Sequence, residues 1–239
     1  MILTDDINYS AAGINFRGYL AYDPEWIQPR PCVMIAHDWG GRGEFFCQKA
    51  RQVAAMGYVG FAIDMYGDAQ LGHTNEQRRA LMTPLKENRE RLAMQMVAAF
   101  NKAATLPQVD AGKIAAIGYC FGGMCVLDLA RTGVPIKGVV SFHGLLSEPI
   151  HTVTHDISAK ILVLHGYDDP LVPTKEITQF ANEMTLKKVD WQVHIYGQTA
   201  HSFTNPEAND LKMGLHYNQT ADNRSWASAT TFLHEAFVN

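Results

Sequence analysis

The sequence predicts an α/β fold: a mostly parallel, doubly wound sheet with helices on both faces, preceded by a β-hairpin. Short apolar segments alternate with longer amphipathic ones from residue 33 onward, and strands separated by helices imply right-handed crossovers between parallel strands. The chain has 239 residues, 47% of them hydrophobic, and no linker-like stretch divides it. It can therefore bury one full core, and we expect a single domain over residues 1–239.

Each predicted element has a local signal. Residues 7–22 alternate loosely between polar and apolar and contain Gly13 and Gly18, which indicates a hairpin. The strands that follow are predicted at 33–36, 59–64, 113–117, 136–142, 160–165 and 191–196. The helices are predicted at 44–56, ending at Gly57, then at 74–105, at 121–131, ending near Gly133, at 174–187 and at 223–237.

The helical region 74–105 has the richest pattern. Thr74 and Gln77 match a capping box, Pro84 predicts an interruption, and apolar residues recur at helical spacing from Leu92 onward. Its basic residues are interpreted as a solvated helix face, from which one of them is able to steer an anionic substrate: Arg78, Arg79, Lys86, Arg89 and Arg91.

Charge and composition narrow the function classes. The net charge is −4 and no basic cluster contains interleaved aromatic residues, so nucleic-acid binding is not expected. No apolar stretch is long enough to span a bilayer, and Asp5 and Asp6 stand where a signal peptide is basic, which predicts a cytoplasmic protein without a membrane partner. The cysteines are too sparse for a disulfide scaffold and form no CxxC pair: Cys32, Cys47, Cys120 and Cys125.

The hexapeptide at residues 118–123, Gly-Tyr-Cys-Phe-Gly-Gly, is the most informative motif. It joins a predicted strand to a predicted helix, and a sharp strand-to-helix turn projects one side chain, here Cys120, above the edge of the sheet. Gly118 and Gly122 remove side chains that would block this turn. Because the helix also directs its free amides at whatever the thiol attacks, the motif predicts a nucleophile, although a buried structural cysteine is the simpler alternative.

A catalytic thiol needs a base, since a free cysteine is only slightly ionised at neutral pH. Among the ten histidines, His201 follows the strand at 191–196 on a loop, at the end of the strand where doubly wound sheets place their sites. His37 also follows a strand end, but it precedes Cys120 and is assigned to another part of the site. His201 is therefore the predicted base.

The base needs an orienting carboxylate, and Asp168 and Asp169 both follow the strand at 160–165. Asp169 is favoured because Pro170 biases it toward an extended backbone, while Asp168 would face solvent or cap the turn. The resulting chain order of nucleophile, acid and base, Cys120, Asp169 and His201, is that of α/β hydrolases.

An oxyanion hole is expected beside the thiol. The helix that starts after Cys120 offers the backbone N–H of Phe121, and the loop after the first parallel strand offers the N–H of Trp39. Four other residues of these two segments are expected to line the site: His37, Asp38, Gly40 and Tyr119.

These motifs together resemble the dienelactone hydrolase family, with further matches at residues 64–67 and 201–206. The resemblance implies a Cys–His–Asp triad made of Cys120, His201 and Asp169, and hydrolysis of a small ester or lactone through a thioester, without a metal or other cofactor. It also implies a glutamate at the position of Asp38, and an arginine soon after the catalytic histidine to hold the substrate carboxylate. Here the segment after His201 offers only Lys212 before Arg224.

The expected protein is a cytoplasmic hydrolase, a monomer or homodimer, that acts on a small-molecule ester or lactone. A thiol-based redox sensor and a non-catalytic binding protein with a hydrolase fold remain alternatives, because an exposed thiol of low pKa serves either chemistry. A metal site at His151 and His155 is not expected, since the intervening β-branched residues disfavour a helix. The loops at 66–84 and 144–158 are the expected walls of the pocket.

Overall fold

The structure, a computed structural model, describes residues 1–149 and 156–238. Within these residues one large sheet has the strand order β1-β2-β4-β3-β5-β6-β7-β8. The strands are β1 (Leu3–Ala11), β2 (Ile14–Tyr22), β3 (Arg30–Ala36), β4 (Val59–Ala62), β5 (Val109–Tyr119), β6 (Gly138–Phe142), β7 (Lys160–Gly166) and β8 (Trp191–Tyr196). Strand β2 pairs antiparallel with both β1 and β4, and all other neighbouring strands pair in parallel. The predicted mostly parallel sheet with an N-terminal hairpin is confirmed.

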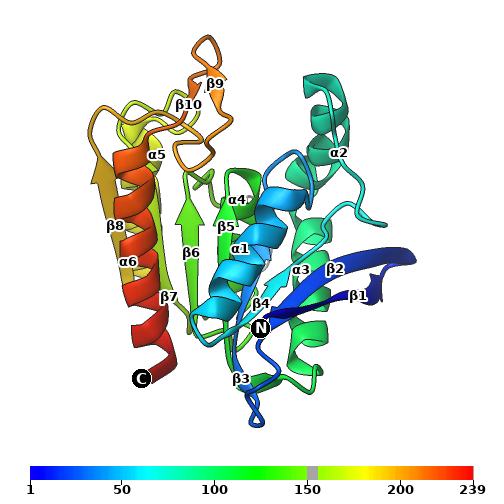
Figure 1. Cartoon of the computed structure of the whole chain (residues 1–239). Coiled ribbons are helices and arrows are strands. Elements are labelled where there is room, and N and C mark those ends of the chain that lie inside the picture. Colours follow the sequence, from blue (N-terminus) through cyan, green and yellow to red (C-terminus); the bar gives the residue numbers. More distant parts are fainter. Residues whose placement is uncertain (150–155, 239) are drawn as a thin grey trace.

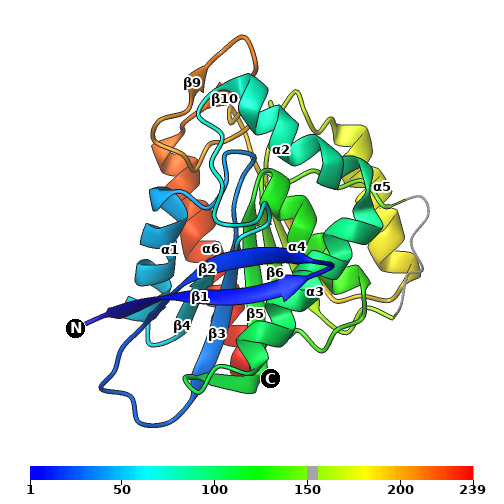
Figure 2. The ribbon, with the colours of Figure 1, turned by 90° about the vertical axis from the view of Figure 1, so that its right-hand side faces the viewer.

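Helices cover both faces of this sheet, as predicted. They are α1 (Glu44–Ala55), α2 (Asn75–Glu87), α3 (Arg89–Ala104), α4 (Phe121–Arg131), α5 (Thr174–Leu186) and α6 (Gln219–Val238). One face packs against α1 and α6, and the other packs against α3, α4 and α5 (Figure 1). The view in Figure 2 shows the β1–β2 hairpin crossing in front of the sheet and α2 lying beyond the strand ends.

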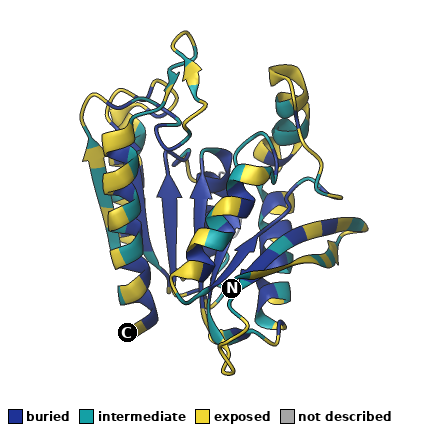
Figure 3. Ribbon diagram, in the orientation of Figure 1, coloured by how far each residue is buried: buried dark blue, intermediate teal, exposed yellow. Residues whose placement is uncertain are grey.

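The central strands form the core. Residues 32–36 of β3, residues 114–119 of β5 and all of β6 are buried (Figure 3). Their side chains alternate between two apolar clusters, so that Met34 packs on the side of α3 and α4 while Val33 and Ile35 pack on the side of α1 and α6. Parallel strands covered on both faces are expected to be apolar in this way.

The register brings the carboxyl ends of the parallel strands to one edge of the sheet. Ala36 at the end of β3 pairs with Gly118, Tyr119 pairs with Phe142, and Gly166 pairs with Tyr196. This edge lies at the top in Figure 1, where the loops after β3, β5, β6, β7 and β8 meet. Ligands of doubly wound sheets bind at this edge, so the fold places the candidate site here.

The predicted interruption of the 74–105 region is present, but it lies four residues beyond Pro84. Helix α2 runs through Pro84, and the break comes at Asn88, whose side chain accepts the Arg91 N–H at 2.9 Å to start α3. Proline removes one backbone donor and frees the carbonyl of the residue four positions earlier. Ala80, which carries that carbonyl, is exposed, so water can satisfy it. The predicted capping box at Thr74 is confirmed.

The prediction of a solvated basic face also fails in part. Arg89 donates two hydrogen bonds to the buried carboxylate of Asp128 on α4 and one to the carbonyl of Ser147 at 3.1 Å. Arg131 of α4 continues this network by pairing with Glu183 of α5 at 2.7 Å. Arg89 therefore ties α3 to α4 and to the loop after β6. Sequence periodicity alone does not reveal this contact.

Candidate active site

Cys120 stands at the junction of β5 and α4. Its φ of 54° and ψ of −113° lie outside the usual regions, and its N–H donates to the Phe142 carbonyl at 2.9 Å. The adjacent glycines allow this turn: a Cβ on Gly118 would lie 2.0 Å from the Gly122 carbonyl oxygen, and one on Gly122 would lie 2.2 Å from the Ala36 carbonyl oxygen. Cys120 is partly exposed, whereas Cys125 and the other cysteines are buried.

His201 and Asp169 meet at the predicted strand ends. His201 Nδ1 lies 2.7 Å from Asp169 Oδ2, and both side chains are buried. The other carboxylate oxygen, Oδ1, accepts the Leu171 N–H at 2.8 Å, which fixes the orientation of the carboxylate. Asp168 is exposed. Because Asp169 accepts the Nδ1 proton, the ring leaves Nε2 free for proton transfer.

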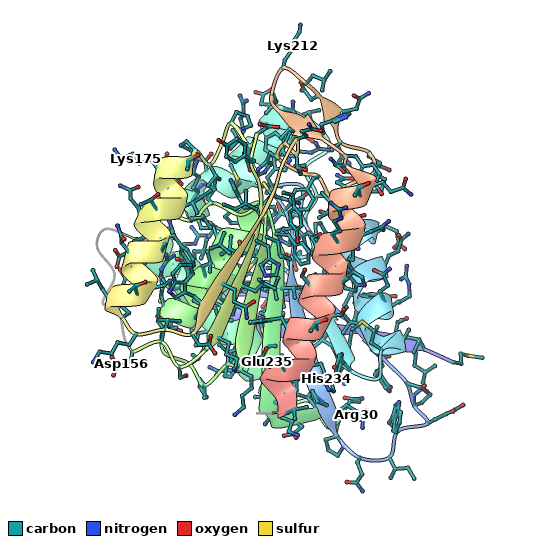
Figure 4. All side chains as sticks on the ribbon, turned by 90° about the vertical axis from the view of Figure 1, so that its left-hand side faces the viewer. Arg30, Asp156, Lys175, Lys212, His234 and Glu235 are labelled. Carbon is teal, nitrogen blue, oxygen red and sulfur yellow. The ribbon has the colours of Figure 1, made fainter. Side chains whose placement is uncertain are left out.

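A short two-stranded unit holds His201 in place. Strands β9 (Asn209–Asp210) and β10 (Leu215–His216) pair antiparallel, and the His201 N–H donates to the Gly214 carbonyl at 3.0 Å. The His201 carbonyl in turn accepts the His216 N–H at 3.0 Å. This hairpin was not predicted, since strands of two residues leave no periodic pattern. At its tip Lys212 points outward, away from the body of the molecule (Figure 4).

Electrostatics couple the imidazole to the thiol. Burial lowers the pKa of His201, but the charge of Cys120 and the hydrogen bond and charge of Asp169 raise it more, to about 10. His201 Nε2 is buried and meets no acceptor at normal hydrogen-bond distance within residues 1–149 and 156–238. A proton on this nitrogen would thus be stabilised by a neighbouring thiolate.

Two backbone donors lie beside Cys120. Trp39, Cys120 and Phe121 border the same cavity, and neither the Trp39 N–H nor the Phe121 N–H has an acceptor in the described part of the chain. The close contact of Gly122 with the end of β3 brings these two segments together. Unpaired N–H groups at such a place are able to receive an oxyanion.

The cavity measures about 240 Å³. It is lined by Trp39, Arg79, Met82, Lys86, Cys120, Phe121, Leu145, Leu171, His201, Ser202, Met213 and Leu215. The expected walls contribute Arg79, Met82 and Leu145, while residues 150–155 of the second expected wall lie outside the described residues. Three α2 residues reach the cavity at helical spacing: Arg79, Met82 and Lys86. Two of the basic residues that were interpreted as a solvated face, Arg79 and Lys86, therefore also line the cavity.

The four other residues that were expected to line the site, His37, Asp38, Gly40 and Tyr119, are not among the lining residues. Tyr119 is buried and stacks on Phe142 at 4.6 Å, on the side of the sheet that α1 and α6 cover. His37 is fully buried, and Gly40 donates its N–H to Asp38 Oδ1 at 2.7 Å. Burial raises the pKa of Asp38, against the lowering effects of the Gly40 N–H, Arg78 and His201.

The described residues contain no metal-like cluster: no group of three or more His, Cys, Asp and Glu side chains gathers there in a way that could hold an ion. His151 and His155, the pair considered from the sequence, lie outside those residues. In the same part of the chain no helix is both long and apolar enough to cross a membrane.

Comparison with known proteins identifies the family. The model of the dienelactone hydrolase family matches residues 16–237. A crystal structure of a dienelactone hydrolase-like promiscuous phosphotriesterase from metagenomic libraries superposes with a TM-score of 0.94 at 34% identity, over 99% of each chain. An uncharacterized Caenorhabditis elegans protein is 36% identical over 152 residues, 62% of this chain and 96% of that one. The carboxymethylenebutenolidase of Pseudomonas putida is 23% identical over 214 residues, 84% of this chain and 86% of that one. The chain therefore belongs to the dienelactone hydrolase family and is an ester or lactone hydrolase with the α/β-hydrolase fold.

Proposed function

We propose that Cys120, His201 and Asp169 form a catalytic triad that hydrolyses small esters or lactones through a thioester intermediate. The observation that supports this most is the buried His201 ring, which contacts Asp169 at 2.7 Å through Nδ1 and is coupled to Cys120 on its other side. Asp169 holds the tautomer, and the paired thiolate is the nucleophile. A structural cysteine would not need either partner.

The reaction proceeds in two halves. The Cys120 thiolate attacks the carbonyl carbon and forms the S–C bond, while the carbonyl electron pair moves to oxygen, where the N–H groups of Trp39 and Phe121 stabilise it. Collapse expels the alcohol oxygen, which takes the proton from His201 Nε2. Water then attacks the thioester as His201 accepts a water proton, and the thiolate leaves. One water is consumed, and the acid and alcohol are released, joined in one molecule when the substrate is a lactone.

The cavity suits a small substrate that carries a negative charge. Its volume of about 240 Å³ holds a compact acyl group, and Arg79 and Lys86 are present in its lining without any acidic side chain. These cations lie on α2, whereas the family resemblance implied an arginine after His201. We therefore assign the substrate class as esters or lactones with a carboxylate, bound from the side of α2.

Turnover of p-nitrophenyl acetate by Cys120→Ala tests the triad. We expect at least a roughly thousandfold loss of kcat, since removing a nucleophile leaves only binding and the oxyanion hole. Intact-mass measurement of acid-quenched wild-type protein is expected to detect an acetyl group on Cys120. Hydrolysis by Cys120→Ala at the wild-type rate would rule out the triad. A thiol that is oxidised reversibly by peroxide without forming an acyl adduct would favour the redox sensor.

Phosphotriesters are a second candidate substrate class. The metagenomic phosphotriesterase is similar over 99% of this chain, and its name states that activity. A thiolate at Cys120 can attack phosphorus in the same way, forming an S–P bond as the aryloxide leaves with its electron pair; water then displaces the thiolate from phosphorus. Turnover of paraoxon, in place of the acetate ester, by the wild type and by Cys120→Ala tests this proposal. Turnover that survives in Cys120→Ala, or none in the wild type, would contradict it.

A further inference from the structure

The peptide that joins Asp38 to Trp39 is held by the side chain before it. His37 Nδ1 lies 2.6 Å from the Asp38 carbonyl oxygen, and His37 Nε2 accepts the Met65 N–H at 3.2 Å. A ring nitrogen that accepts a backbone N–H carries no proton, so the neutral ring has its proton on Nδ1 and donates it to the Asp38 carbonyl. The two contacts fix the tautomer, and the ring spans the ends of β3 and β4.

This carbonyl determines where the next N–H points. In a trans peptide the C=O and N–H groups lie in one plane and point in opposite directions, and the described residues contain no cis peptide. Since the Asp38 carbonyl points at His37, the Trp39 N–H of the same peptide points away from His37. It meets no protein acceptor among the described residues, and Trp39 borders the cavity with Cys120.

The following peptide is held at both ends. Tyr66 donates its hydroxyl to the Trp39 carbonyl at 3.0 Å, and Asp38 Oδ1 accepts the Gly40 N–H at 2.7 Å. The Tyr66 ring makes an edge-to-face contact with the His37 ring, with centroids 4.7 Å apart, and stacks on the Phe121 ring. The same two side chains thus connect the Trp39 loop to the start of α4.

We infer that His37 and Tyr66 are positioning residues for the oxyanion hole, which hold the Trp39 N–H toward the reacting carbonyl before substrate binds. The inference rests on the proposed function, in which this N–H is one of the two oxyanion donors. A donor that is already in place costs no reorganisation when charge develops, and losing one lowers turnover by roughly a hundredfold or more. A misdirected donor is expected to cost part of that factor.

The test compares two reactions of the same thiol. Acylation by p-nitrophenyl acetate creates an oxyanion, whereas alkylation by iodoacetamide forms an S–C bond as iodide leaves and creates none. The other cysteines are buried, and Cys120→Ala serves as the blank for both reactions. We expect His37→Gln and Tyr66→Phe to slow acylation by roughly ten- to a hundredfold and to leave the alkylation rate unchanged.

Two matched variants sharpen the comparison. The amide nitrogen of His37→Asn takes the place of Nδ1 and still reaches the Asp38 carbonyl, so this variant is expected to acylate faster than His37→Gln. Tyr22→Phe removes another tyrosine hydroxyl, which donates to Asp5 Oδ2 at 3.4 Å on the β1–β2 hairpin, and is expected to leave both rates unchanged.

Parallel loss of acylation and alkylation in His37→Gln and Tyr66→Phe would overturn the inference, because the residues would then act on the thiolate or on folding. Unchanged acylation in both would overturn it as well. In either case the proposed catalytic triad is not contradicted as long as Cys120→Ala is inactive. Hydrolysis by Cys120→Ala at the wild-type rate would instead reject the proposed function.

Discussion

Cys120 presents its thiol by adopting a backbone conformation that residues with a Cβ disfavour. Its φ is 54° and its ψ is −113°, and such outliers cost on the order of 1–3 kcal/mol each. The surroundings impose this conformation: the Cys120 N–H is bound to the Phe142 carbonyl, and α4 starts in close contact with β3 through Gly122. Strain at this residue is thus balanced by packing elsewhere, and it is expected to be released when the Cβ is removed.

Cys120→Gly is therefore expected to be more stable than Cys120→Ala by about 1 kcal/mol, because alanine keeps the Cβ and glycine does not. In ordinary structure the order is reversed, since glycine costs about 0.5–1 kcal/mol relative to alanine. Urea unfolding of the two variants measures the difference. Ala80→Gly, at an exposed position inside α2, is the control and is expected to lose stability. If the alanine variant were as stable as the glycine variant, the backbone at Cys120 would not be strained by its Cβ.

At the scale of elements, sequence patterns predict what is local. The strand, turn and helix around Cys120 follow from glycines and periodicity within a short stretch, and α4 has the predicted bounds. Asp169 and His201 were expected to lie close together because each follows the end of a parallel strand and these ends share one edge of the sheet. In the structure their side chains are in contact. Residues 66–84 were expected to form a wall of the cavity, and Arg79 and Met82 line it, but the contribution of Lys86 was not predicted. Amphipathic spacing does not say which polar face of a helix meets a cavity, because that depends on packing between distant segments.

Helix α2 brings two cations to the cavity on one face. Arg79, Met82 and Lys86 lie three and four positions apart and therefore share a side of the helix. Both cations are exposed at the cavity, where a charge pair is worth about 0.2–1 kcal/mol. The double variant Arg79→Gln/Lys86→Gln is expected to lower kcat/KM for p-nitrophenyl hydrogen succinate by roughly two- to thirtyfold relative to the acetate ester.

Salt and a matched variant separate this local effect from net charge. The succinate preference of the wild type is expected to weaken as ionic strength rises, since screening acts on exposed charges. Arg91→Gln removes a positive charge from the exposed side of the neighbouring α3 and is expected to keep the preference. Equal losses for succinate and acetate in the double variant would show that α2 shapes the cavity without selecting an anion.

At the scale of the whole molecule, buried histidines link folding to pH. Burial lowers the pKa of His37 to about 4, against the raising effects of the Asp38 carbonyl and Asp64, while Arg42 lowers it further. Burial and the nearby His201 hold the pKa of His143 well below its usual value as well. Both rings stay neutral in the folded protein while the unfolded chain takes up protons below its usual pKa of about 6.5. Stability is therefore lost as pH falls from about 6.5 toward 4.

His201 acts in the opposite direction, because its pKa is raised to about 10 by Cys120 and Asp169 despite burial. Its contribution is present below about pH 6.5 and is lost as pH rises toward 10. The free energy of unfolding is thus expected to be limited by His37 and His143 on the acid side and by the triad on the alkaline side, with its maximum between them.

His37→Asn tests the acid side, because asparagine keeps the contact with the Asp38 carbonyl but binds no proton. The wild type is expected to lose roughly 2 kcal/mol more than this variant between pH 7 and pH 5, the linkage expected for a pKa of about 4 in the folded state and about 6.5 in the unfolded state. Urea unfolding at the two pH values measures the loss. Tyr66→Phe removes a neighbouring hydroxyl that does not titrate in this range, so it is expected to lower stability equally at both. Identical acid sensitivity of the wild type and His37→Asn would mean that the His37 ring takes up its proton without disturbing the peptides around Trp39.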